Sequence, residues 1–449
     1  MTERKSLYKE FAGYVSLNVL GMLGLSCYIL ADTFFVSLGL GTDGLAALNL
    51  AVPVYSFIHG SGLMLGMGGA SSYAIFRGAG NERAAGVVFT DTLYAAAVFA
   101  AVFVLAGAAF SRPITAALGA DDAVFAMTET YLRVILLFAP AFILNNVVLC
   151  FVRNDGAPKL AMAAMLAGSL SNIFLDWLFM FPFGMGIFGA VFATGLAPVI
   201  SLAVLSAHFF RRRNGFRPVR KCPDLRAVGR NLSLGFPSLV TEVSSGIVMI
   251  AFNAILLRLE GNIGVAAYGI IANISLVVLS LYTGIAQGIQ PIVGRARGAC
   301  DSRTAGQVFR MALLLMLAVS AAVYLVVFFC AGPVSDIFNS AGDAHLTAIA
   351  IPGLRLYFIA TPFAGFNIIA SMFFTASGRP LPAHIVSLLR GFIVILPAAF
   401  LLSALGDITG VWLAFPATEA LVALVCVVLF LVYRRRTAVQ QTPDVRRDA

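Results

Sequence analysis

Charged residues are scarce in this chain of 449 residues. Asp, Glu, Lys and Arg together make up 11% of it, whereas 60% of the residues are hydrophobic. Soluble globular proteins carry about 25% charged residues, so this composition excludes that class. Histidine is also rare, with four residues, and the six cysteines include no CxxC pair. The sequence therefore indicates no zinc site, no disulfide framework and no cofactor.

The apolar residues are gathered in long runs. A helix needs about 20 predominantly apolar residues to cross a bilayer. Runs of this length predict an all-α integral membrane protein with twelve transmembrane helices. The predicted spans are 14–36, 45–68, 87–110, 128–151, 159–181, 186–210, 232–257, 265–290, 308–331, 347–373, 381–403 and 410–433.

The net charge of +9 is distributed between the spans rather than on one arm. Basic residues lie at the amino terminus, in alternate loops and in the stretch 211–230. Under the positive-inside rule both termini and 211–230 are cytoplasmic. We expect the protein in the plasma membrane of a prokaryote, which is the inner membrane in a Gram-negative one. The basic charge thus has a topological role, and we expect no nucleic-acid partner. Trp177 and Trp412 are expected near the outer headgroups.

The two halves of the chain repeat each other at an offset of 222 residues. Even numbers of spans make such repeats parallel and place a substrate path at their interface. We predict an amino-terminal lobe at 1–210, a cytoplasmic linker at 211–230, a carboxy-terminal lobe at 231–436 and a disordered tail at 437–449, in a monomer surrounded by membrane lipids. The repeat pairs Leu132, Arg133, Pro140, Asn145, Gly156 and Pro158 with Leu354, Arg355, Pro362, Asn367, Gly378 and Pro380.

One carboxylate, Asp32, lies near the end of the first apolar span. A charge in the bilayer interior costs on the order of 3 kcal/mol by insertion scales, so such residues usually have a function. Two other interpretations remain. In the first, Asp32 lies close enough to the outer headgroups to be solvated. In the second, a neighbouring helix neutralises it for packing.

Several motifs, taken in order, resemble the multidrug and toxic compound extrusion (MATE) family. They are Asp32-Thr33, Gly68-Gly69-Ala70-Ser71-Ser72, Gly235-Phe236-Pro237 with Glu242, and Gln287-Gly288-Ile289-Gln290-Pro291. The resemblance extends over essentially the whole chain. It implies a transporter rather than an enzyme, with two lobes around a central cleft. It also implies export of organic cations and other amphipathic compounds in exchange for H⁺ or Na⁺.

Four polar residues resemble the cation site of one branch of this family. Asn172 and Asp176 are four apart and share one face of a helix, and Asp32 and Thr194 lie at the same depth of the amino-terminal lobe. The resemblance implies that these four bind the coupling ion, as metal ligands if the ion is Na⁺. The alternative for Asn172 and Asp176 is a hydrogen-bonded pair between helices.

The predicted substrate-binding residues are Glu242, Asn145, Asn146 and Gln287, beside aromatic walls such as Phe34, Phe138, Phe142 and Phe179. Asn367 occupies the position where another branch of the family has a carboxylate, which argues against a cation site in the carboxy-terminal lobe. Arg390 needs a partner in its span, and we expect a structural pair with Glu419.

Two other functions compete with drug export. A lipid-linked oligosaccharide flippase of the same superfamily would need cations in its cavity to hold pyrophosphate, whereas the prominent intramembrane charges here are acids. A membrane-embedded enzyme such as an acyltransferase would need clusters of His or Asp at the membrane surface. The histidines, at positions 59, 208, 345 and 384, form no such cluster.

Overall fold

The computed structural model describes residues 2–210, 214–339 and 343–441, and every element in these ranges is helical. Long apolar runs without water to hydrogen-bond the backbone favour helices, which satisfy their own polar groups. The elements are α1 (Thr2–Gly78), α2 (Glu82–Ala117), α3 (Phe125–Leu137), α4 (Ala139–Asn154), α5 (Pro158–Met180), α6 (Gly186–Phe210), α7 (Leu225–Gly298), α8 (Ser302–Phe338), α9 (Ala344–Tyr357), the 3₁₀ turn η1 (Phe358–Ala360), α10 (Thr361–Ala376), α11 (Pro380–Leu388), the π turn η2 (Leu389–Ile393) and α12 (Ile395–Gln441).

The prediction of twelve crossings is confirmed. In the described residues eight helical stretches are long and apolar enough to span a membrane, and the bent pair α3 and α4 makes nine. Three of these stretches each contain a break that divides them into two crossings: Gly41 in α1, Gly261 in α7, and Gly406 with Asp407 in α12. Gly41 and Gly261 have φ near +60°, a conformation that glycine adopts without steric cost.

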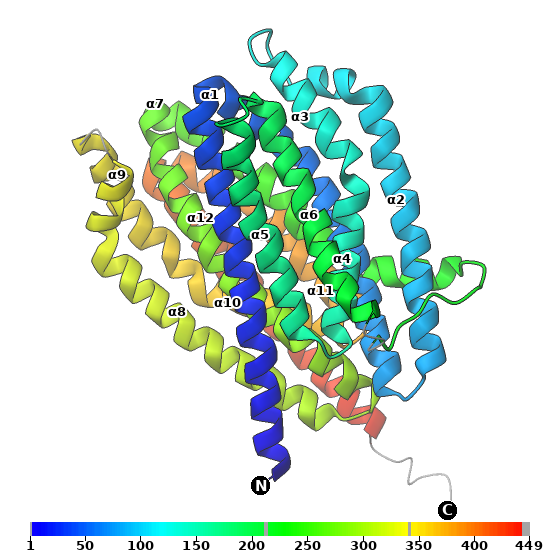
Figure 1. Cartoon of the computed structure of the whole chain (residues 1–449). Helices are drawn as coiled ribbons and strands as arrows, with labels where there is room; N and C mark the ends of the chain where they lie inside the picture. Colours follow the sequence, from blue (N-terminus) through cyan, green and yellow to red (C-terminus); the bar gives the residue numbers. More distant parts are fainter. Residues whose placement is uncertain (1, 211–213, 340–342, 442–449) are drawn as a thin grey trace, which may run out of the picture.

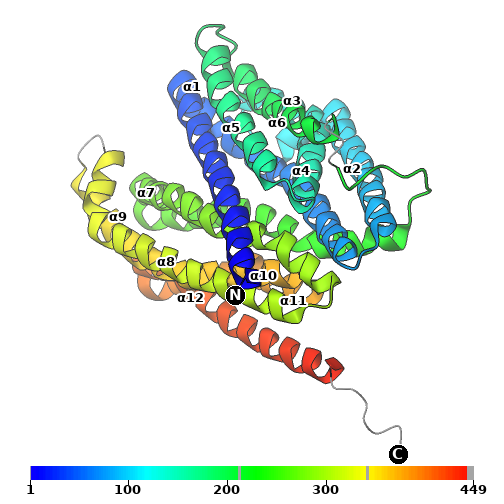
Figure 2. The same ribbon diagram turned by 60° about the horizontal axis from the view of Figure 1, so that its bottom comes forward.

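The helices form two groups that correspond to the two sequence repeats. Elements α2 to α6 and most of α1 lie on one side and most of α7 to α12 on the other, while the first turns of α1 reach the second group, as Figure 2 shows. In Figure 1 the amino terminus and the last turns of α12 lie at the same end of the bundle. We call this the basic end, because α1 ends there with Arg77 and α7 with Arg295 and Arg297.

The two halves touch most closely near the basic end, through glycines of α1 and α7. A Cβ added at Gly235 would lie 1.7 Å from the Met64 carbonyl oxygen, and one at Gly68 would lie 1.9 Å from the Asn231 carbonyl oxygen. Only glycine permits such an approach of two backbones. The glycine motifs in these two helices therefore close this end of the molecule.

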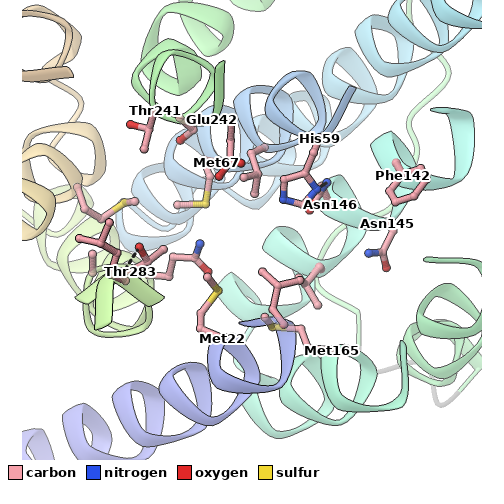
Figure 3. Close-up of a pocket in the computed structure, with 18 of the residues that line it drawn as sticks. Met22, His59, Met67, Phe142, Asn145, Asn146, Met165, Thr241, Glu242 and Thr283 are labelled. Atoms are coloured by element: carbon pink, nitrogen blue, oxygen red, sulfur yellow. Dashed lines mark hydrogen bonds between the residues drawn. The ribbon is translucent and has the colours of Figure 1, made fainter. Parts of the chain in front are cut away.

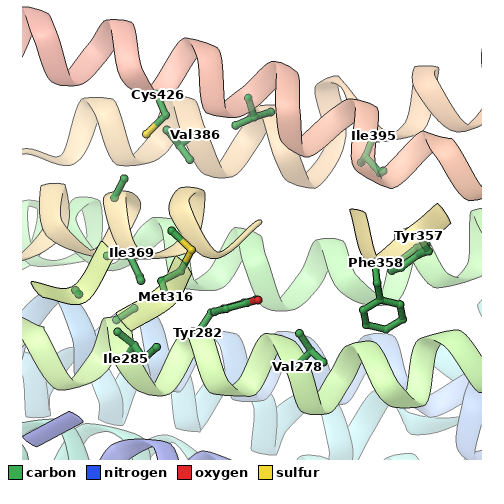
Figure 4. Close-up of a cluster of buried hydrophobic side chains, with 14 of the residues drawn as sticks. Val278, Tyr282, Ile285, Met316, Tyr357, Phe358, Ile369, Val386, Ile395 and Cys426 are labelled. Atoms are coloured by element: carbon green, nitrogen blue, oxygen red, sulfur yellow. The ribbon is translucent and has the colours of Figure 1, made fainter. Parts of the chain in front are cut away.

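The second half has a continuous apolar core. Tyr282 of α7, Met316 of α8, Val386 of α11 and Cys426 of α12 pack into it (Figure 4). Trp412 is also part of this core with 1% of its surface exposed, so its ring packs inside the protein and does not face the headgroups as predicted. Its ring stacks with Tyr268 at 6.5 Å between centroids, which buries more apolar area than an interfacial position would.

The stretch predicted as a solvated linker is docked on the first half. Helix α7 already begins at Leu225, within the range 211–230. Phe216 is fully buried among the rings of Phe89, Phe151 and Phe209. Residues 211–213 lie outside the described part of the chain. At the other end of the chain α12 continues to Gln441, so the tail predicted from 437 begins in a helix, and 442–449 lie outside the described residues.

Candidate ion and substrate sites

The four residues predicted as an ion site lie together inside the first half. Asp32 comes from α1, Asn172 and Asp176 from α5, and Thr194 from α6; all four are buried. With its amide nitrogen oriented towards Asp176, Asn172 donates to Asp176 Oδ2 at 3.1 Å and accepts from the Thr194 backbone N–H at 3.3 Å. The carboxylates of Asp32 and Asp176 are close enough to interact electrostatically.

Two carboxylate oxygens of this cluster have no partner. Asp32 Oδ1 and Asp176 Oδ1 are buried and accept no hydrogen bond within the described structure. A buried carboxylate is costly unless it is paired, coordinated or protonated. The donor set consists of carboxylate, amide and hydroxyl oxygens, which suit a hard monovalent cation, and either carboxylate can also take up a proton. The cluster can therefore change charge by binding H⁺ or Na⁺.

Two tyrosines beside this cluster were not predicted from the sequence. Tyr131 of α3 is 3% exposed, interacts with the Thr194 side chain and lies within electrostatic reach of both carboxylates. Tyr28 lies one turn before Asp32 on α1, and its hydroxyl is 3.0 Å from that of Tyr55. Tyr131 belongs to α3, which meets α4 at a 46° bend that periodicity does not reveal.

A cavity of about 230 Å³ lies between the two halves. Side chains from α1, α4, α5 and α7 converge on it (Figure 3). All four predicted substrate-binding residues line it, as does one member of the ion cluster. These residues are Glu242, Asn145, Asn146, Gln287 and Thr194. Thr194 thus borders both the cavity and the ion cluster.

The rest of the wall is mixed in character. Of the four predicted aromatic wall residues only Phe142 lines this cavity. Phe34, by contrast, is 59% exposed on the outside of α1. His59 was not predicted to take part, yet it lines the cavity with Nδ1 3.3 Å from Asn146 Nδ2. The remaining wall is mostly apolar, which is typical of small-molecule sites.

The predicted pair of Arg390 and Glu419 is confirmed. Arg390 Nε donates to Glu419 Oε1 at 2.9 Å, and a second guanidinium nitrogen lies 2.8 Å from the same oxygen. Asn367 donates to Glu419 Oε2 at 2.7 Å. The π turn η2 contains Arg390, which also borders the cavity. The Glu419 carboxylate is thus already neutralised by an arginine of the chain.

A buried arginine below the cavity was not predicted. Arg153 of α4 is 1% exposed and donates to Gln287 Oε1 at 2.6 Å, to Asn18 Oδ1 at 3.0 Å and to Gln290 Oε1 at 3.4 Å. Gln290 in turn donates to the Met67 carbonyl oxygen at 3.1 Å. This network joins α4 and α1 of the first half to α7 of the second.

The comparisons with known proteins agree with this arrangement. The family model MatE matches residues 19–178 and 237–401. The chain belongs to the MatE family. It is therefore a multi-pass membrane transporter and not an enzyme.

Similar proteins cover this MatE chain almost completely. The multidrug export protein MepA of Staphylococcus saprophyticus is 23% identical, and the match covers 98% of this chain and 97% of that MepA chain. MepA of Staphylococcus aureus is 24% identical, and the match covers 97% of this chain and 96% of that MepA chain. A crystal structure of MATE in complex with MaL6 has a TM-score of 0.90 at 25% identity, covering 97% and 98%. A multidrug resistance MATE family transporter in an outward-facing conformation has a TM-score of 0.89 at 25% identity, covering 97% of each chain.

Proposed function

We propose that this protein exports cationic and amphipathic organic compounds in exchange for H⁺ or Na⁺ by alternating access. The observation that carries the proposal is the buried cluster of Asp32 and Asp176, in which each carboxylate has an oxygen without a partner. A structural pair would have its acceptors satisfied by neighbouring donors. The unsatisfied oxygens favour a site that binds a cation reversibly.

The coupling step is a change of charge inside the first half. When a proton or Na⁺ binds, the repulsion between Asp32 and Asp176 falls. When the ion leaves, the repulsion returns. A ligand shifts a conformational equilibrium only by its differential affinity for the two states. Thr194 borders both cluster and cavity, so a movement of α6 that accompanies ion binding would reshape the drug site.

The substrate class follows from the cavity wall. Glu242 provides an acid there, while Arg390 is already paired with Glu419. An ammonium group would be attracted by Glu242 and its apolar body by residues such as Met22 and Phe142. The names of the MepA relatives, which are multidrug export proteins, support this class. Pyrophosphate recognition by a flippase would need unpaired cations in the wall, and the single lining arginine does not supply them.

The experiment uses purified protein in vesicles loaded with a cationic dye. Proton and sodium gradients are imposed separately across the membrane, and dye movement is followed against a variant carrying Asp32→Asn. We expect one of the two gradients to drive transport in the unmodified protein and neither to do so in the variant. Equal dye movement with no gradient, or driven transport in the variant, would contradict the proposal.

A further inference from the structure

One ionisable side chain in the wall of the cavity between the two halves has no role in the coupling step described above. His59 is half-buried in the second crossing of α1 and lines the same cavity as Glu242 of α7 (Figure 3). Histidine is the side chain whose charge ordinarily changes between about pH 5 and pH 8. Its protonation would place a positive charge in the wall of a site that attracts cations.

The neutral ring of His59 is held in one orientation and one tautomer. The Asn146 amide nitrogen lies 3.3 Å from Nδ1, and because an amide nitrogen can only donate, the ring hydrogen is on Nε2. The ring also stacks on Tyr55, one turn earlier on α1, with 5.7 Å between centroids and 16° between planes. Tyr55 in turn meets the edge of the Phe142 ring at 5.6 Å. The imidazole is therefore fixed in the cavity wall.

Helices α1 and α7 touch beside this histidine. A Cβ added at Gly60 would lie 3.1 Å from the Glu242 Cβ. Tyr55, on which the His59 ring stacks, is close enough to Glu242 to interact electrostatically. Residues on both sides of the imidazole are thus neighbours of Glu242. A charge on His59 would act on the same bound group as the Glu242 carboxylate.

The rest of the wall would leave such a charge unmasked. Apart from two tyrosine phenols, the other ionisable side chain among the described lining residues is Arg390, which is paired with Glu419. Helices α4, α5, α6 and α10 contribute uncharged residues to the described wall. Arg153 of α4 does not line the cavity and donates to amide oxygens below it. A protonated His59 would therefore face a single carboxylate in this wall, that of Glu242.

The internal repeat indicates that packing does not require this histidine. At the offset of 222 residues His59 corresponds to Leu281, and its partner Asn146 corresponds to Ile368. An apolar pair thus occupies the equivalent positions of the second half, where Ile368 also lines the cavity. A polar pair in the first half alone favours a role in the site rather than in the fold.

We propose that His59 sets the charge preference of the drug cavity, an inference that rests on the proposed export of organic cations. With a neutral ring, Glu242 gives the cavity a preference for cations over neutral compounds. When Nδ1 takes up a proton, the Asn146 amide turns its oxygen towards the new N–H, and the wall gains a positive charge. This charge offsets that of Glu242, so the preference for cations is lost. His59 thereby makes the selectivity of the cavity depend on pH, separately from the ion site at Asp32 and Asp176.

The test measures equilibrium binding to the purified full-length protein, so it does not depend on transport. The ligands are tetraphenylphosphonium, whose charge is the same at every pH, and its neutral analogue triphenylphosphine oxide. Both are titrated at about pH 5.5 and about pH 8.5, near the two ends of the histidine range. The background carries Asp32→Asn and Asp176→Asn, which removes titration of the ion site. We expect the dissociation constant of tetraphenylphosphonium to be roughly tenfold higher in acid, as for one added charge several ångströms away in a partly solvated site.

Three variants in this background identify the group responsible. His59→Gln keeps an acceptor for Asn146 but cannot take up a proton, so its affinity for tetraphenylphosphonium should be equal at both pH values. His59→Lys carries the charge throughout and should bind the cation weakly at both, while binding of the neutral analogue shows that the cavity is intact. His345→Gln is the matched control and should keep the tenfold difference. His345 lies at the start of α9, outside the cavity, with Nε2 3.0 Å from Glu260.

The outcomes separate this inference from the proposed function. A pH dependence that persists in His59→Gln would assign the effect to another group, such as Glu242, and would overturn the inference. The same holds for equal affinities at both pH values before His59 is changed, or for an equal loss of the neutral analogue in acid. Absence of tetraphenylphosphonium binding at every pH would overturn the proposed function and this inference together.

Discussion

Arg153 of α4 and Gln287 of α7 are joined by a hydrogen bond of 2.6 Å between the two halves of the molecule. The guanidinium is buried and the side-chain oxygens that accept from it belong to neutral amides, so the contact depends on amide oxygens rather than on an ion pair. A buried charge of this kind costs free energy unless its donors are satisfied. Separation of the halves at the basic end would break these bonds, which makes them part of the closed conformation.

The first prediction concerns this contact. Arg153→Met keeps an apolar chain in the same space but removes the bonds to Gln287 and Gln290. Each bond contributes about 0.5–1.5 kcal/mol, so we expect roughly a tenfold shift towards conformations open at the basic end. Spin labels at Glu82→Cys and Arg303→Cys, in a background without native cysteines, would report the distance between the halves. Arg133→Met, which breaks an ion pair with Glu129 inside α3, is the control. An unchanged distance distribution would contradict this role.

The second prediction concerns drug selectivity. Glu242→Gln should weaken export of cationic dyes roughly tenfold while sparing neutral compounds, because an interaction with a charged group is worth about 1.5–3 kcal/mol. Apparent affinities for a dye series of matched size and different charge would be measured in vesicles. Glu129→Gln removes an acid outside the cavity and serves as the control. Equal losses for charged and neutral compounds would indicate a structural role for Glu242.

The third prediction concerns topology. Cys222 lies exposed in the stretch between the lobes, which the positive-inside rule assigns to the cytoplasm. With the other five cysteines replaced, an impermeant thiol reagent should label Cys222 only after cells are permeabilised. Asp122→Cys, in the connection between α2 and α3, should be labelled in intact cells. Labelling of Cys222 from outside would reverse the assigned orientation.

The fourth prediction concerns pH and the start of α8. Hydrogen bonds from the side chain and backbone of Thr304 hold the pKa of the Asp301 carboxyl below its ordinary value of 3.8. The folded-state pKa is the lower one, so this stabilisation is complete above about pH 3.8 and is lost as the pH falls through the folded-state value. Asp301→Ala should lower Tm at pH 7, with a capping loss of about 1 kcal/mol. The difference in Tm between Asp301→Ala and the unmodified protein should shrink in acid. Asp122→Ala should not lower Tm at pH 7.

The crossings and the repeat could be predicted because they depend on composition and spacing. Apolar runs of sufficient length determine the spans, and the pair of Arg390 and Glu419 follows from the cost of an unpaired charge within one. Spacing alone pairs Asn172 with Asp176 on one helix face, whereas the resemblance to the family's cation site is what added Asp32 and Thr194 to them. These features need no knowledge of how distant helices pack.

Other features depend on packing that a linear pattern does not contain. Phe216 lies among basic residues in the sequence, and the aromatic surface formed by α2, α4 and α6 explains its burial. Trp412 has the pattern of an interfacial ring, yet Tyr268 and Gly353 provide a place for it in the core. Arg153 looks like a topological charge at the end of a span. Its role becomes visible only when Gln287 is placed beside it.

The central claim is that Asp32 and Asp176 act as one ion site. Removing either carboxylate ends the change of charge on which coupling depends, and residues that act as a unit have non-additive effects. The decisive measurement is gradient-driven dye efflux from vesicles for Asp32→Asn, Asp176→Asn and the double variant at equal protein levels. We predict that each single change abolishes efflux and that the double variant is little worse than either. Modest single losses that multiply in the double variant would contradict the shared site.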